Sequence, residues 1–294
     1  MHKNHSLKEL NTWGVGGECT VLSSPNDESS ASAVIMETLN SALPLYVLGG
    51  GSNVLVSDGL LNAAVLRTVS LNNLRIKTTY SDGSADIDAG AGASVRDLLA
   101  LAVRSGLCGI EFMTGIPGTL GGALWGNAAA GGETLGSFLT EVRTIGTDGR
   151  SRIFTPDELN WEYRTCPWNS KDTVLITGCS MNLKRGDIES IRSRVRHFAS
   201  LKKGQPFGKK TAGCVFKNPF GTSAGKLLDS AGCKMMRVGD ACVSPCHANF
   251  IENMGSASAH DIFTLGEKCR ARVFDIYGIK LEYEICFFGS FPEA

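Results

Sequence analysis

The sequence predicts a mixed fold of helices and strands, organised in two compact units. Its 294 residues are too many for one small core and too few for three full domains. Short apolar segments of strand character alternate with helical patterns, such as the pattern that follows Ser94. After a helical segment that ends near Gly204, basic residues and glycine become frequent. We expect this change of character to mark the boundary between the two units.

Each expected element has a local signal. Strands are expected at 45–48, 54–57, 63–67, 85–89, 141–146, 173–177 and, with one apolar and one polar face, 281–287. Helices are expected after polar caps at 23–30, Ser94 and Asp187, and over 262–276 before Gly278. The arginines of the helix that follows Asp187 are expected to form a solvated face. Between the first two strands, three consecutive glycines are expected to form a turn at a sheet edge.

Composition and charge exclude several classes of protein. Hydrophobic residues make up 43% of the chain, and 29 basic residues balance 29 acidic ones, so no overall field attracts nucleic acid or an anionic membrane. No apolar run has the length of a signal-peptide core near the start or of a membrane span later. We therefore expect a cytoplasmic protein without membrane insertion. Its ten cysteines are expected to be reduced thiols.

Two glycine-rich stretches, 49–53 and 109–132, predict a site for a large ligand that carries phosphate. Three consecutive glycines cost conformational entropy, so a bound ligand is the expected reason for them. The backbone amides of such loops can form a cradle for phosphate. A tight turn in a core explains two or three glycines but not this density. A third pattern, at 90–95, resembles a dinucleotide fingerprint, but Val95 occupies its third glycine position, so no Rossmann site is expected there.

Several residues could carry chemistry, and each has a structural alternative. Cys214 lies among lysines in a glycine-containing loop, which favours ionisation of the thiol, whereas a buried inert cysteine is the alternative. Glu284 is either an acid or part of a solvated strand face. Arg164 is either a carboxylate clamp or a stacked arginine. The Cys and His residues at 242–247 lack a second pair of ligands, so no metal is expected.

Taken together, five motifs resemble the UDP-N-acetylenolpyruvoylglucosamine reductase (UDP-N-acetylmuramate dehydrogenase) family. They occur in the family's order and spacing, from about Asn11 to Gly289. The motifs are Leu48-Gly49-Gly50-Gly51-Ser52-Asn53, Gly115-Ile116-Pro117-Gly118-Thr119 with Gly121, Gly122 and Asn127, Tyr163-Arg164, Ala212-Gly213-Cys214-Val215-Phe216-Lys217-Asn218-Pro219, and Leu281-Glu282-Tyr283-Glu284.

The resemblance implies an α+β fold. A two-subdomain FAD-binding domain of the vanillyl-alcohol-oxidase type would cover 11–188, split near 67–72, and a smaller α+β substrate-binding domain would cover 189–294. The short interval between Arg164 and Cys214 is similar to the form of the family that lacks an inserted substrate loop. FAD is the implied bound cofactor. The residues implied to bind it are Leu48, Gly49, Gly50, Gly51, Ser52, Asn53, Gly115, Ile116, Pro117, Gly118, Thr119, Gly121, Gly122 and Asn127.

The resemblance also implies a reaction, the reduction of UDP-N-acetylglucosamine enolpyruvate to UDP-N-acetylmuramate for peptidoglycan, with NADPH as co-substrate. Flavin N5 would give a hydride to the enolpyruvyl group. Arg164 and Glu284 would stabilise the charge that develops. Cys214 would supply the proton, at a position where the family usually has serine. A thiol is a stronger acid than a hydroxyl, so this substitution keeps proton donation plausible.

The implied partner is a UDP-sugar, and a monomer is expected. Tyr163, Lys203, Lys217 and Asn218 are the implied substrate contacts. Gly204 occupies a position where the family often has lysine, so either Lys202 or Lys203 could take that lysine's place.

Two other functions remain open. A flavin oxidase or dehydrogenase that acts on an alcohol would share the cofactor fold, but the matches at 213–219 and 281–284 argue against it. A binding module without flavin would have no need for Arg164, Glu284 and a proton-bearing side chain at 214.

Overall fold

The computed structural model describes residues 4–159, 168 and 172–292. Contacts along the chain divide it into two compact units. Unit 1 contains Met1–Val21, Gly51–Ala63 and Gly204–Ala294, and unit 2 contains Leu22–Gly50 and Ala64–Lys203. The expected mixture of helices and strands is confirmed. The expected division into an FAD-binding domain that ends at 188 and a substrate-binding domain that begins at 189 is defined by ligand binding, and it stays a prediction.

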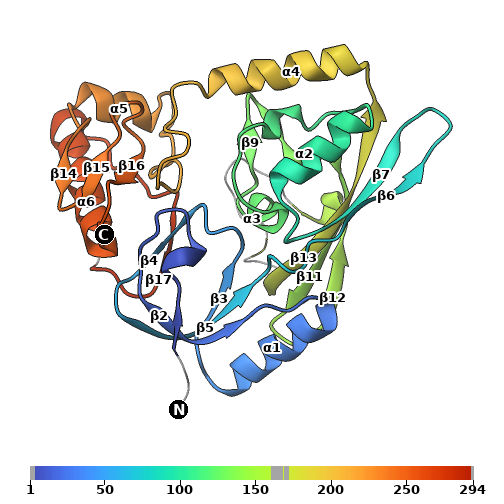
Figure 1. Ribbon diagram of the computed structural model, residues 1–294, viewed down its shortest axis with the longest axis horizontal. Coiled ribbons are helices and arrows are strands. Elements are labelled where there is room, and N and C mark those ends of the chain that lie inside the picture. The colour runs from blue at the N-terminus through green and yellow to red at the C-terminus, as the bar shows by residue number, and fades with distance from the viewer. Residues whose placement is uncertain (1–3, 160–167, 169–171, 293–294) are drawn as a thin grey trace. The chain divides into compact units, whose positions relative to one another are not determined.

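Unit 2 is built on an antiparallel sheet with the strand order β12-β11-β13-β7-β6 (Figure 1). The long central strand β13 pairs with β11 on one side and β7 on the other, and its end also pairs with β8. The strands of unit 2 are β3 (Leu45–Leu48), β6 (Leu74–Thr79), β7 (Ala85–Gly90), β8 (Leu107–Cys108), β9 (Ala129–Ala130), β10 (Glu133–Thr134), β11 (Leu139–Gly146), β12 (Ser151–Phe154) and β13 (Thr173–Arg185).

The two faces of this sheet belong to different cores, as the alternation of side chains along a strand requires. Leu175 of β13 packs in a cluster with Ala31 and Ile35 of α1. The next residue, Ile176, packs in a larger cluster with Leu98 of α2 and Leu124 of α3. The helices of unit 2 are α1 (Glu28–Asn40), α2 (Val95–Arg104), α3 (Leu120–Trp125) and α4 (Ile188–Leu201), with short 3₁₀ turns η2 (Glu111–Met113), η3 (Leu135–Phe138) and η4 (Pro156–Glu158).

The helix starts predicted from sequence are confirmed by their caps. Asp27 caps α1 within the expected polar stretch. The Ser94 hydroxyl accepts a hydrogen bond from Asp97 N at 3.0 Å, and the Asp187 carboxylate accepts one from Ser190 N at 2.8 Å. A side-chain oxygen in these positions satisfies an amide that has no partner in the first turn of a helix.

Unit 1 combines the start of the chain with its C-terminal third. Its secondary structure comprises β1 (His5–Ser6), η1 (Lys8–Leu10), β4 (Val54–Val56), α5 (Ala224–Ser230), β14 (Arg237–Val238), β15 (Ala241–Val243), β16 (Ile251–Asn253), α6 (Ala259–Tyr277) and β17 (Cys286–Phe288). Strands β2 (Glu18–Ser23) and β5 (Leu60–Arg67) run across the division between the units. The fully buried Trp13 ties the early segment to the later one, since its indole N–H donates to Ile251 O at 2.8 Å.

The triple-glycine stretch follows β3, which is the edge strand of its sheet, as expected. The next strand, β4, pairs in parallel with β17. One expectation about strands was wrong: 281–287 is not one continuous strand, because only 286–288 (β17) is regular and Tyr283 forms an isolated bridge with Phe216. The expected alternation of burial remains, with Leu281 and Ile285 buried and Glu282 exposed. None of the helices in the described residues is long and apolar enough to cross a membrane.

Candidate functional site

The two glycine-rich stretches meet within unit 2. A Cβ atom built on Gly49 would lie 2.5 Å from the Thr119 hydroxyl, and one built on Gly50 would lie 2.9 Å from Gly118 Cα. Glycine is therefore favoured at Gly50 by the close approach of two backbone segments and at Gly49 by the approach of the Thr119 side chain. We call the segment Gly115–Gly122 the glycine loop. Its Gly115 and Gly118 have φ of +73° and +98°, a region that also favours glycine.

Several polar donors at this meeting point have no partner among the described residues. The amides of Gly49, Gly50 and Gly118 donate no hydrogen bond there. The Thr119 hydroxyl is buried and also has no partner in that part of the chain, and the residue is only 7% exposed. Gly49 and Gly118 are half-buried and Gly50 is exposed, whereas the Thr119 hydroxyl is a buried donor whose lack of a partner among the described residues costs free energy. An acceptor bound at this place would complete these donors. We call these three amides and the Thr119 hydroxyl the donor cradle.

Three other residues predicted to bind the cofactor have structural roles in the fold. The Gly121 amide donates to Ala91 O at 2.8 Å, and a Cβ on Gly121 would meet Ala91 Cβ at 2.8 Å. Glycine is thus needed there for packing. Asn127 is 1% exposed and has a positive φ of +42°. The Leu48 carbonyl accepts a bond from Thr68 N at 2.9 Å, which fixes the strand end from which Gly49 emerges.

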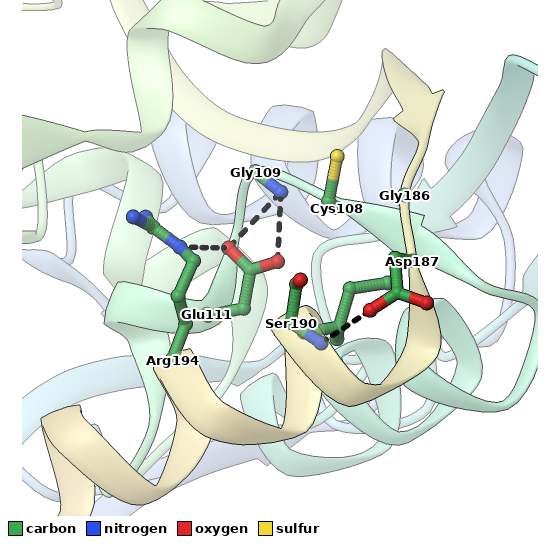
Figure 2. Close-up of a pocket in the computed structure, with 8 residues that line it drawn as sticks. Cys108, Gly109, Glu111, Gly186, Asp187, Ser190 and Arg194 are labelled. Carbon is green, nitrogen blue, oxygen red and sulfur yellow. Dashed lines mark hydrogen bonds and ion pairs between the residues drawn. The ribbon is translucent and has the colours of Figure 1, made fainter.

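Helix α4 contacts the segment that leads into the glycine loop (Figure 2). Glu111 is 1% exposed, and its carboxylate accepts bonds from Gly109 N and from Arg194 Nε, both of which Figure 2 shows converging on it. Arg194 also donates twice to Glu133, at 2.8 Å each. The α4 arginines are exposed, as expected for a solvated face, and Arg194 in addition pairs with Glu111 and Glu133. A cavity of about 260 Å³ lies beside these groups, but its lining includes no residue of the predicted site.

The two candidate lysines at the end of α4 differ. The Lys202 ammonium donates to the Thr114 carbonyl, immediately before the glycine loop, and burial lowers its pKa. Lys203 is exposed. Sequence reasoning gave Lys202 no structural role because Thr114 lies 88 residues away along the chain.

In unit 1, the segments that carry Cys214 and Glu284 lie side by side. Glu284 N donates to Val215 O at 2.8 Å, so the residue after Cys214 pairs directly with Glu284. The Asn53 side chain donates to the Glu284 carbonyl at 3.1 Å, which adds the end of the triple-glycine turn to this group. The side chains of Cys214 and Glu284 are both half-buried. The structure thus brings together three of the residues that the sequence singled out.

Asn249, which the sequence analysis missed, holds the Cys214 segment. Its side chain accepts from Phe216 N at 2.9 Å and donates to Phe216 O at 2.8 Å, and its carbonyl accepts from Val215 N. Asn249 is 2% exposed, so these bonds are shielded from water. A polar residue between His247 and Phe250 was the only available signal in the sequence.

Tyr283 fixes the residue before Glu284. Its hydroxyl donates to Glu267 at 2.6 Å, and Arg270 donates to the same carboxylate at 2.8 Å. Burial, and then the bond to Glu267, raise the pKa of Tyr283. The phenol therefore stays protonated and acts as a fixed donor.

The implied substrate contacts have varied surroundings. Lys217 forms an ion pair with Glu282 at 3.3 Å. The Asn218 side chain accepts from Ala224 N at 3.0 Å and so holds the first turn of α5. Tyr163 and Arg164 lie outside the described residues.

Among the residues that the structure describes, every cysteine is a free thiol. That part of the chain also contains no cluster of three or more His, Cys, Asp or Glu side chains arranged to hold a metal.

Comparison with known proteins identifies the family. The family model of an FAD binding domain matches residues 20–154, and that of the UDP-N-acetylenolpyruvoylglucosamine reductase C-terminal domain matches 205–288. The reductase of that name from Methylorubrum extorquens is 39% identical over 285 residues, which are 96% of this chain and 90% of the relative. The one from Anaplasma marginale is 35% identical over 95% of this chain and 90% of its own length.

A solved structure agrees with the sequence matches. The crystal structure of UDP-N-acetylenolpyruvylglucosamine reductase from Thermus caldophilus is 32% identical, has a TM-score of 0.81 and covers 98% of both chains. The α+β fold implied by the resemblance, an FAD-binding domain with a C-terminal domain, is thereby confirmed. The protein is an FAD-binding oxidoreductase, and the chain belongs to the UDP-N-acetylenolpyruvoylglucosamine reductase family.

Proposed function

We propose that this protein reduces UDP-N-acetylglucosamine enolpyruvate to UDP-N-acetylmuramate, with FAD as bound cofactor and NADPH as the source of electrons. Family membership supports the reaction. The single structural observation that carries the proposal is the donor cradle, with its buried Thr119 hydroxyl. A diphosphate supplies the acceptors that such donors lack.

The residues present fit FAD. At Gly49 and Gly50 a Cβ would collide with the Thr119 hydroxyl and with Gly118 Cα, so glycine lets the two segments that carry the donors lie together. The residues proposed to hold the cofactor are Leu48, Gly49, Gly50, Gly51, Ser52, Asn53, Gly115, Ile116, Pro117, Gly118, Thr119, Gly121, Gly122 and Asn127. When bound and reduced by NADPH, FAD would supply the hydride for the enolpyruvyl double bond. We also propose 11–188, with subdomains split near 67–72, as the cofactor-binding domain and 189–294 as the substrate-binding domain.

The chain's own residues would bind the substrate and move the proton. Cys214 would donate the proton that completes the reduction, and Glu284 with Arg164 would stabilise the developing negative charge. The bond from Glu284 N to Val215 O supports this pairing of roles, because it holds the two segments in register. Tyr163, Lys203, Lys217 and Asn218 are proposed to contact the UDP-sugar. The Lys217 ion pair is well exposed, so exchanging Glu282 for a substrate anion costs little.

A spectroscopic experiment tests the function. The purified protein, supplied with FAD, should be yellow, and under anaerobic conditions NADPH should bleach the flavin absorbance. Adding UDP-N-acetylglucosamine enolpyruvate should then restore the colour. A protein that binds no FAD refutes the proposal. Bleaching by a simple alcohol without NADPH would instead favour an alcohol oxidase or dehydrogenase.

The role of Cys214 has its own test. Cys214→Ser keeps a proton-bearing group and should retain turnover, whereas Cys214→Ala should lose about 100-fold or more in kcat. Iodoacetamide should inactivate the wild type, substrate should protect it, and Cys214→Ser should resist the reagent. Inactivation of Cys214→Ser at the wild-type rate would assign the sensitivity to another cysteine and remove the proposed role.

A further inference from the structure

We propose that helix α4 is a positioning element for the glycine loop, with Lys202 and Arg194 as the residues that hold the loop's two flanks. The inference rests on the proposed function, since it concerns how the glycine loop is kept ready for FAD. The inference adds a role for α4. The sequence predicts the length and the cap of this helix, but it does not predict which residues the helix contacts.

The upstream flank is held at two points. Lys202 donates to the Thr114 carbonyl, and Gly115 follows at once. One turn earlier, Glu111 accepts from Gly109 N at 3.0 and 3.2 Å and from Arg194 Nε at 3.2 Å. Figure 2 shows the Arg194 side chain reaching from α4 toward the Glu111 carboxylate. A buried carboxylate shared between a backbone amide and a guanidinium fixes the start of this segment.

The downstream flank is held by the same helix. Arg194 bonds to both carboxylate oxygens of Glu133 in β10, and β10 pairs with β9, which follows the loop after α3. Phe198 of α4 is 5% exposed and packs on Gly131, where a Cβ would come within 2.9 Å of its ring. The guanidinium of Arg194 lies 5.6 Å from the centre of the Phe198 ring. One helix therefore contacts the chain both before and after the glycine loop.

The contacts from α4 matter for FAD binding because a glycine-rich loop has high conformational entropy when nothing holds it. Gly115 and Gly118 have positive φ, and a glycine backbone loses more conformational entropy than any other when it is ordered. If that ordering took place only on binding, it would weaken the affinity for FAD. Anchors that order the loop in advance lower this cost. Glu111 and Arg194, which line the cavity on this side of α4, bond to each other.

The test compares matched variants on one helix. Lys202→Met keeps most of the aliphatic stem and removes the donor, and Lys202→Arg restores a donor. Arg194→Met removes the shared ion pair. Arg192→Met is the control, because Arg192 lies on the same helix and pairs only with exposed Glu189 among the described residues. For each protein, the Kd for FAD is measured by quenching of flavin fluorescence. Thermal unfolding and hydrogen exchange over 113–123 are measured on the protein without FAD.

We expect the Kd to rise about tenfold in Lys202→Met, equivalent to about 1.4 kcal/mol, with faster exchange over 113–123 and little change in the unfolding temperature. Arg194→Met should weaken binding at least as much. Lys202→Arg should recover most of the affinity, and Arg192→Met should match the wild type. A wild-type Kd in Lys202→Met, or a loss that follows the unfolding temperature in all variants, overturns the inference. Failure of the wild type itself to bind FAD overturns the proposed function, while the exchange data still decide whether α4 orders the loop.

Discussion

The close backbone approach of Gly50 and Gly118, in the proposed cofactor site, predicts the effect of adding one methyl group. In Gly50→Ala the new Cβ would lie 2.9 Å from Gly118 Cα, whereas ordinary contacts begin at 3.4 Å. The two backbone segments must therefore separate by about 0.5 Å, because no flexible side chain is available to yield. Overpacking of this kind costs roughly 1–3 kcal/mol. The shift also moves donors that are proposed to face the diphosphate.

We expect the Kd of Gly50→Ala for FAD to rise by about tenfold or more, since 1.4 kcal/mol corresponds to a factor of ten. Fluorescence titration with FAD measures this, and urea unfolding of the protein without FAD measures the packing cost. Gly126→Ala is the matched control, because its new Cβ would meet only Gly122 O at an ordinary 3.6 Å. Equal affinity in Gly50→Ala and the wild type would refute the reasoning that the two glycine segments meet to bind the cofactor.

Three further changes have defined outcomes. Thr119→Val should raise the free energy of unfolding without FAD by about 1 kcal/mol, because it removes a buried hydroxyl that has no partner among the described residues. The same change should weaken FAD binding. A less stable protein in urea unfolding would contradict this. Asn249→Ala should destabilise the protein by about 2–4 kcal/mol, because two buried Phe216 groups lose their partner, while exposed Asn72→Ala should have little effect in the same assay. Burial lowers the pKa of His247, so the unfolded state binds the extra proton first, and the free energy of unfolding should fall as pH drops below 6.5. Urea unfolding at pH 7.5 and 5.5 should show a smaller fall in His247→Gln, and an equal fall would exclude this histidine.

The sequence predicted the features that depend on near neighbours. Ser94 and Asp187 were identifiable as caps because an N-cap acts on an amide three residues later. Gly278, with φ of +68°, ends α6 as expected. The density of glycine likewise indicated two places where backbone approaches something closely, although it did not indicate that the two stretches approach each other.

The remaining features depend on partners far away in the chain. Arg194 meets Glu111 across 83 residues, so the spacing of arginines on α4 could suggest only a solvated face. The same limit applies to β4, whose partner β17 lies near the other end of the sequence. Asn249 was missed for this reason too, because its role depends on Phe216, 33 residues earlier.

The pairing of β4 with β17 has a consequence for how the protein is made. Unit 1 draws on three separated stretches of chain, and Trp13 bonds to a residue 238 positions later. During synthesis, the early segment emerges from the ribosome long before its neighbours in the fold, and contacts of such high sequence separation form slowly. Trp13 therefore spends that interval without the later segment that it contacts in the fold.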